Sequence, residues 1–273
     1  MSEHESGKTQ ENRKKGRERK LTTVLLIAAV AVMVFALARL IPIIMDYRNS
    51  EDAYMDLAGD IVDAGTDEEE TEAEEETDWS DVVIDFSSLK EINSDVVGWI
   101  RFDDTTALPI DYPILHGETD NTYLRTNLYG ESHTAGSIFL ESANSPDFSD
   151  LYNIIYGHNM RNNTMFGSLK QYKRDEDFYD ENPFFTIYTE EGAYRYQIFT
   201  YEEIKDDSSF YSVGYAADDA YQDLIDEIVA GSMRDTGITP TAGDRIVMLS
   251  TCTSTGDDYR FVVFGVFTDQ VTY

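Results

Sequence analysis

The residues with the most distinctive chemistry in this chain are its one cysteine, Cys252, and its four histidines. A cysteine thiolate attacks carbonyl carbon, and a nearby histidine can exchange protons with the thiol and with the leaving group. Arg260 follows the cysteine by eight residues, and a guanidinium is a permanently charged planar group suited to stabilising an oxyanion. These residue types indicate covalent acyl-transfer chemistry, and a buried inert thiol is the alternative.

The pattern around Cys252 predicts a strand that ends at the cysteine. In a strand over Arg245–Cys252, alternate side chains share a face, which puts Ser250 and Cys252 on the same side. Residues 253–259 are rich in turn-forming types, and a second strand begins at Arg260. If the two strands pair as a hairpin, Cys252 and Arg260 face each other across its open end. The alternative is that Arg260 is a surface residue at the start of a strand.

Three histidines are candidates for the general base that works with the cysteine. His4 precedes a long apolar segment, which would separate it from the rest of the chain, so His116, His133 and His158 remain. His158 follows the apolar run 153–156 and a glycine, which places it at a strand end beside a polar loop. His133 lies in a polar loop and His116 beside a glycine, where solvated histidines are common. The residues favour His158 and leave the other two open.

The N-terminal region predicts a membrane anchor. Residues 1–20 carry seven Lys/Arg against four Asp/Glu, and residues 21–38 are eighteen residues without a charge. We therefore expect a cytoplasmic basic tail over 1–20 and a transmembrane anchor over 21–45, with the rest of the chain outside the cell. Ala36-Leu37-Ala38 resembles a cleavage site, so a secretory signal is the alternative, but the apolar run exceeds the usual length of about 7–15 residues.

Residues 46–81 are predicted to form an acidic extracellular linker, because they contain sixteen acidic residues and one basic residue. Such a segment cannot bury much apolar surface and repels itself, so it should be extended and act as a spacer. Metal binding by the acidic run is a weaker alternative. The formal net charge of −32 makes nucleic acid an unfavourable partner, because phosphate contacts require a basic surface.

Residues 82–273 are predicted to form one mostly β domain with helical decorations. Short β-branched and aromatic runs separated by Gly, Asn, Asp and Pro favour about eight strands, which suit a closed barrel. The expected strands are 98–102, 112–115, 136–140, 153–156, 184–189, 194–202, 245–251 and 260–268. Apolar periodicity predicts three helices, around 86–92, around 165–172 and, as a long insertion before the cysteine strand, over 218–233.

Several kinds of site are not expected. One cysteine cannot form an intramolecular disulfide, so the core must stabilise the fold. The chain also has no glycine-rich phosphate loop and no paired Cys/His spacing for zinc. We therefore expect neither a cofactor nor a metal site.

Several motifs match one known family. Leu249-Ser250-Thr251-Cys252 with Arg260 resembles the signature of sortases, and the segments 154–160 and 165–169 resemble the histidine region of class B sortases. Asp95-Val96-Val97-Gly98-Trp99-Ile100 and Asp111-Tyr112-Pro113-Ile114 resemble their first strands. The helical insertion at 218–233 distinguishes class B from the smaller class A barrel. The resemblance covers nearly all of residues 82–273.

The resemblance implies an eight-stranded sortase barrel and a cysteine transpeptidase of Gram-positive bacteria. Such an enzyme cleaves an NPxTx-like sorting motif of a surface protein after its threonine, and passes the acyl group to an amine of a peptidoglycan precursor. The matched positions imply Cys252 as nucleophile, His158 as general acid and base, and Arg260 as the oxyanion and substrate anchor. Ser250, Thr251 and Thr253 would contact substrate.

The resemblance also implies a location and leaves alternatives open. The enzyme would be a single-pass cell-membrane protein with a cytoplasmic N-terminus and an extracellular catalytic domain. The loop 253–259 is small, polar and acidic where the family varies, so its substrate contacts are open. The alternatives are a membrane-tethered β-barrel binding module with an inert cysteine, a plain cysteine endopeptidase, and a sortase that polymerises pilins.

Overall fold

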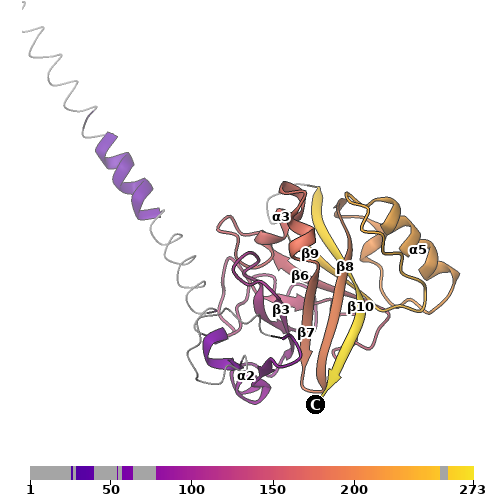
Figure 1. Ribbon diagram of the computed structural model, residues 1–273. Helices are drawn as coiled ribbons and strands as arrows, with labels where there is room; N and C mark the ends of the chain where they lie inside the picture. Colours follow the sequence, from indigo (N-terminus) through magenta and orange to yellow (C-terminus); the bar gives the residue numbers. More distant parts are fainter. Residues whose placement is uncertain (1–25, 27–28, 40–53, 55–56, 64–77, 253–257) are drawn as a thin grey trace, which may run out of the picture. The chain divides into compact units, whose positions relative to one another are not determined.

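The computed structural model describes residues 26, 29–39, 54, 57–63, 78–252 and 258–273 (Figure 1). The chain divides into two units, Met1–Asn49 and Ser50–Tyr273. In the first, residues 29–39 are helical and their large apolar side chains are exposed. In the described part of the chain, no helix is both long and apolar enough to span a membrane. The predicted basic tail, 1–20, and most of the predicted anchor, 21–45, lie outside the described residues.

The second unit is built on a closed barrel of eight strands, in the ring order β10-β8-β7-β3-β4-β5-β6-β9 (Figure 1). The strands are β3 (Val96–Phe102), β4 (Asp111–Leu115), β5 (Ile138–Leu140), β6 (Tyr152–His158), β7 (Phe184–Thr189), β8 (Gly192–Lys205), β9 (Ile246–Cys252) and β10 (Tyr259–Thr272). All eight predicted strands and the closed barrel are confirmed. Most strands are longer than predicted, and β6 continues through His158.

Two of the strand pairs in the barrel are parallel, and one of them matters for the site. β4 pairs with β5 and β6 pairs with β9 in parallel, while the other neighbours are antiparallel. The β6–β9 pair runs in continuous register from Tyr152 opposite Ile246 to His158 opposite Cys252. Parallel neighbours need a long connection. Here the chain between them contains β7, β8 and the helical insertion.

Short helices connect and cover the strands. They are α2 (Phe86–Ile92), η1 (Gly167–Lys170), α3 (Gln171–Arg174), α4 (Phe178–Glu181), η2 (Ser209–Tyr211) and α5 (Asp219–Ala230). The helix predicted around 165–172 begins only at Gly167, because Met165 has a φ of 53° and bridges to Asn159. α4 and η2 were not predicted, because a single helical turn carries too little periodic pattern.

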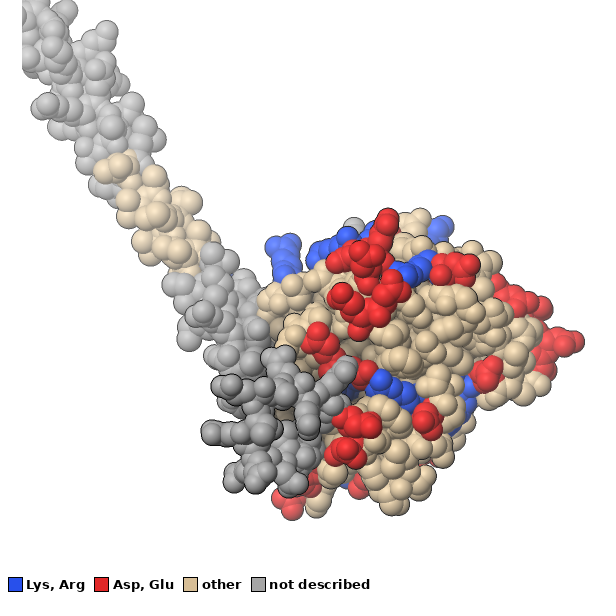
Figure 2. Space-filling model, in the orientation of Figure 1, with Lys and Arg blue, Asp and Glu red and all other residues tan. Residues whose placement is uncertain are grey.

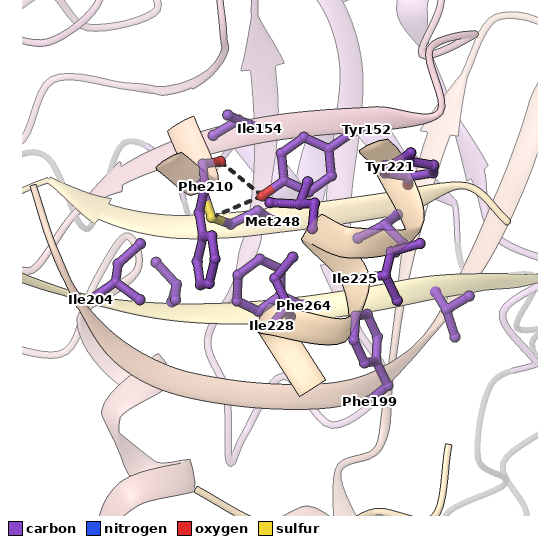
Figure 3. Close-up of a cluster of buried hydrophobic side chains, with 14 residues drawn as sticks. Tyr152, Ile154, Phe199, Ile204, Phe210, Tyr221, Ile225, Ile228, Met248 and Phe264 are labelled. Carbon is purple, nitrogen blue, oxygen red and sulfur yellow. Dashed lines mark hydrogen bonds between the residues drawn. The ribbon is translucent and has the colours of Figure 1, made fainter. Parts of the chain in front are cut away.

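The insertion that contains α5 packs on the outside of the barrel. Asp218 caps the helix by accepting hydrogen bonds from the backbone N–H groups of Ala220 and Tyr221. The apolar face of α5 meets outward side chains of β6, β8, β9 and β10 in one buried cluster (Figure 3). Within it, the Tyr152 hydroxyl donates to the carbonyl of Phe210, 2.9 Å away. This layer therefore fixes η2 and the segment after β8 against the β6–β9 pair.

The structure differs from the expected acidic linker at residues 54–63. Tyr54, Leu57 and Ile61 are only 7%, 7% and 8% exposed, and the Tyr54 hydroxyl accepts a hydrogen bond from the backbone of Leu128. β1 (Val62–Asp63) then pairs with β2 (Val83–Ile84). Part of the segment predicted to be a free linker is therefore part of the folded unit. Residues 78–81, the end of the predicted linker, are described and lead directly into the predicted domain at residue 82. The acidic run before them, within residues 64–77, lies outside the described residues.

This contact leads to a prediction about truncation. Removing residues 1–77 should lower the free energy of unfolding by about 2–5 kcal/mol relative to removing residues 1–49, because three buried apolar side chains and a strand pair are lost. Urea unfolding of the two truncated chains measures the difference. Equal unfolding midpoints and slopes would show that residues 54–63 add nothing to stability.

The surface of the folded unit is strongly acidic. Residues 82–273 contain 33 Asp and Glu but 12 Lys and Arg. Figure 2 shows acidic side chains over much of the visible face, with fewer basic ones among them. Such a surface repels polyanions, which keeps nucleic acid an unfavourable partner.

Candidate active site

The barrel brings Cys252 and His158 together through backbone register. Cys252 is the last residue of β9 and His158 the last residue of β6, and the two are register partners in the parallel pair. Neighbouring strands lie about 4.8 Å apart, so the backbones of the two residues are adjacent. Residues 94 positions apart in the sequence thus reach the same strand edge, which is the geometry that a cysteine–histidine pair requires.

The imidazole of His158 is fixed by one strong contact. The side chain is 5% exposed, and its Nε2 lies 2.6 Å from the carbonyl oxygen of Leu124. A carbonyl oxygen can only accept, so Nε2 carries the proton. The bond therefore selects the tautomer in which Nδ1 is the basic nitrogen of the neutral ring. This arrangement leaves a single ring atom to take up and release a proton.

Arg260 lies at the same end of the barrel. β9 and β10 are antiparallel with Val262 opposite Ser250, and continuing this register by two residues brings Arg260 opposite Cys252. The hydroxyl of Thr251 extends the ladder, because it bonds to both the N–H and the carbonyl of Phe261 at 3.1 Å. The predicted hairpin geometry is therefore present. The sequence-predicted cysteine, histidine and arginine come from three adjacent strands, β9, β6 and β10.

A cleft of about 490 Å³ opens beside these strand ends. It is lined by residues of β5, β6, β9, β10, η2 and nearby loops: Asp120, Asn121, Leu124, Phe139, Tyr156, Asp206, Tyr211, Ser250, Thr251 and Arg260. Three of the sequence-predicted site residues therefore line it, and His158 is tied to it through Leu124. A volume of this size suits a short peptide segment.

The predicted substrate-binding residues have different surroundings. Ser250 is buried, and its hydroxyl lies 2.9 Å from that of Tyr211. Thr251 is also buried, and its hydrogen bonds to the backbone of Phe261 give it a role in the β9–β10 ladder. Thr253 lies outside the described residues. Of the two described residues, Ser250 is the one whose polar contact is with another residue of the cleft wall.

Two tyrosines form part of the cleft wall that the sequence reasoning missed. Tyr156 and Tyr211 stack with ring centroids 6.2 Å apart and an interplanar angle of 11°. The Tyr156 hydroxyl donates to Glu141 at 2.6 Å, and burial together with this carboxylate raises the pKa of the tyrosine. Tyr156 lay in the segment that resembles sortases, two residues before His158. Nothing in the local sequence of Tyr211 marked it.

The other two histidines lie elsewhere. β4 is parallel to β5 and β5 is antiparallel to β6, so His116, just after β4, is at the opposite strand edge from His158. The Nδ1 of His133 accepts a hydrogen bond from the backbone of Ala135, 3.1 Å away. Neither of these histidines lines the cleft. Of the three candidate histidines, His158 is therefore the one whose backbone is in register with Cys252.

No metal-binding cluster accompanies the site within the described residues, since no three His, Cys, Asp or Glu side chains gather there closely enough to hold an ion. The groups that the geometry brings together, a cysteine position, an oriented imidazole and a guanidinium beside a peptide-sized cleft, are those of an acyl-transfer site.

Comparison with known proteins agrees with this geometry. Residues 104–268 match the Sortase domain family. Sortase B of Listeria monocytogenes (serovar 1/2a, strain EGD-e) is 34% identical over 180 residues, which cover 65% of this chain and 71% of that protein. Sortase B of Staphylococcus aureus (strain NCTC 8325) is 32% identical over 167 residues, covering 61% and 67%.

Solved structures give the same result. Sortase B from B. anthracis in complex with AAEK1 superposes with a TM-score of 0.68 at 31% identity, covering 83% of this chain and 99% of that one. A Staphylococcus aureus sortase B–substrate complex gives a TM-score of 0.63 at 31% identity, covering 67% and 84%. The chain therefore belongs to the sortase family, among the sortase B proteins, and is a cysteine transpeptidase of that family.

Proposed function

We propose that this transpeptidase cleaves an NPxTx-like sorting motif of surface proteins after its threonine and transfers the protein to an amine of a peptidoglycan precursor. The observation that carries the proposal is the register of His158 with Cys252, next to Arg260 at the start of β10. The cleft beside them and the substrate complex of S. aureus sortase B support a peptide substrate.

The proposed reaction has two halves. The thiolate of Cys252 attacks the carbonyl carbon of the threonine in the scissile bond, and the guanidinium of Arg260 stabilises the oxyanion. Protonated His158 gives its proton from Nδ1 to the departing amine, because Nε2 is bound to Leu124, and a thioester to Cys252 forms. His158 then takes a proton from the acceptor amine, which attacks the thioester and releases the thiolate.

Incubation of the purified full-length chain with sorting-motif peptides, with and without amine acceptors, tests the function by mass spectrometry. A product that joins the peptide through its threonine to the acceptor is the expected result. Hydrolysis alone, even with acceptors present, would favour a cysteine endopeptidase. Binding without cleavage would favour a binding module with an inert cysteine, and transfer only to a lysine of a pilin would favour pilin polymerisation.

We also propose that the chain is a single-pass membrane protein with a cytoplasmic N-terminus and an extracellular catalytic domain. The uncharged residues 21–38 and the basic residues that precede them support this orientation. Protease treatment of intact cells tests it: the catalytic domain should be degraded while an N-terminal tag is protected. Protection of both would contradict the proposed location.

The proposed role of Arg260 leads to a third expected outcome. Arg260→Lys should lower kcat/KM by about 10²–10³-fold. Lysine keeps the positive charge but lacks the planar guanidinium, whose several N–H donors can bind the oxyanion and neighbouring protein acceptors at the same time. Peptide cleavage and a melting curve measure the effect. Turnover close to that of the parent would reduce Arg260 to a general electrostatic role, and loss of the fold would make it structural.

A further inference from the structure

We propose that Asp206 is a positioning residue for Arg260: its carboxylate orients the guanidinium toward the cleft in which the oxyanion forms. The inference rests on the proposed function and extends it to a residue that no sequence motif indicated. Asp206 lines the same cleft as Arg260, and it follows directly after β8.

The backbone fixes the two residues relative to each other. Arg260 is the register partner of Ile204, and Tyr259 is that of Lys205, so Asp206 leaves β8 just beyond the arginine. The N–H of Asp206 then donates to the carbonyl of Asp258 at 3.0 Å, which continues the contact between the two segments. The position of the carboxylate therefore depends on the same strand pair that holds Arg260.

The side chains make the contact that orients the guanidinium. Nη2 of Arg260 lies 3.4 Å from Oδ2 of Asp206, and Nη1 donates to the carbonyl of Tyr259 at 3.1 Å. Two acceptors on two different nitrogens restrict rotation of the planar group. An arginine has five N–H donors in fixed directions, so a bond to a carboxylate and a bond to an oxyanion are geometrically compatible.

The other carboxylate in the cleft wall has a different partner. Oδ1 of Asp120 accepts a hydrogen bond from the backbone of Ser142 at 2.8 Å, which ties it to the loop after β5. Among the described contacts of Arg260, Asp206 is the acidic partner. The side chain of Asp206 is 47% exposed while that of Arg260 is 17% exposed. A pair this exposed adds little to folding stability, so its loss should affect catalysis more than the fold.

Asp206→Asn is the primary test, measured in the full-length chain with a sorting-motif peptide. We expect kcat to fall about 10-fold, which corresponds to about 1.4 kcal/mol of activation free energy, with KM within about 2-fold. The melting temperature should stay the same. Asp206→Glu should recover part of kcat, because it restores the carboxylate charge. The recovery should be incomplete, because the glutamate side chain is one methylene longer.

Glu203→Gln is the matched control. Glu203 lies on β8, three residues before Asp206. Its substitution removes the same charge, and it pairs with Lys173 at 2.6 Å, away from the cleft. Its kcat should equal that of the parent chain. An equal fall in both variants would show an effect of total charge and would overturn the positioning role.

A double-mutant cycle separates positioning from direct action on the substrate. In an Arg260→Ala background, Asp206→Asn should cause no further loss of kcat, because there is no guanidinium left to orient. The same loss in both backgrounds, or no loss in the parent, would overturn the proposal. A parent chain that cleaves no peptide would overturn the proposed function as well, whereas an active parent with a silent Asp206→Asn overturns this inference alone.

Discussion

Cys252→Ala is expected to abolish both cleavage and transfer of a sorting-motif peptide, with a loss of about 10⁴-fold or more in kcat. Without a thiol, no thioacyl intermediate can form, and the remaining groups can only assist attack by water. The barrel should stay folded, because the register of β9 with β6 and β10 is made by backbone hydrogen bonds. Product analysis by mass spectrometry and a melting curve measure the two effects.

The single cysteine makes a direct control possible. A peptide that stalls after acylation should add its mass to the parent chain, and the adduct should map to Cys252 and be absent from the alanine variant. Labelling by a soluble thiol reagent distinguishes a reactive thiol from a packed inert one, which would react only after unfolding. Retained cleavage in the alanine variant would end the assignment of Cys252 as nucleophile.

The strands could be predicted from sequence because each carries a strong local signal. Alternating and β-branched runs such as 184–189 and 245–251 are bounded by Gly, Pro and Asn, and the structure has strands there, Phe184–Thr189 and Ile246–Cys252, within one residue of the predicted bounds. The parallel pairing of β6 with β9 has no local signal, because it joins segments separated by β7, β8 and α5. Only the resemblance to a family could supply that pairing before the structure.

The same distinction explains which site residues were found. Cys252, His158 and Arg260 each stand at a strand end within a recognisable motif. Asp206 and Tyr211 instead come from the segment between β8 and α5, which tertiary contacts hold at the cleft: Asp206 bonds to the backbone of Asp258, and Tyr211 packs against the buried cluster. The sequence of a loop does not indicate which residue one of its polar or aromatic side chains will contact in the folded protein.

The acidic linker was misjudged for a different physical reason. The charge count over residues 46–81 combines two different parts: a short amphipathic stretch and the acidic run that follows it. Tyr54, Leu57 and Ile61 recur at spacings of three and four residues, which is the pattern of one helix face. Burial of a few apolar side chains can order a short segment despite a high mean charge, because charged neighbours on the opposite face stay in water. A charge count over a shorter window separates the amphipathic stretch from the acidic run.

His158→Ala is expected to be nearly inactive, with a loss of about 10²–10⁴-fold in kcat, which is the usual contribution of a general acid and base. His158 is the histidine whose backbone is in register with Cys252, and the bond from Nε2 to Leu124 directs Nδ1 to proton transfer. The variant should remain folded, since the hydrogen bond that the ring makes to the carbonyl of Leu124 joins it to a loop and not to the strand ladder. Single-turnover cleavage and a melting curve measure activity and fold.

His116→Ala and His133→Ala are the matched controls, because each removes one imidazole from the same domain. His116 lies at the opposite strand edge, and His133 bonds within its own loop, so both variants should keep most of their activity. The acid and base roles can also be separated. A peptide ester with a good leaving group needs no protonation, so His158→Ala should acylate with it far faster than with an amide, yet remain slow in transfer to an amine. If His133→Ala were the inactive variant, the assignment from strand register would be wrong.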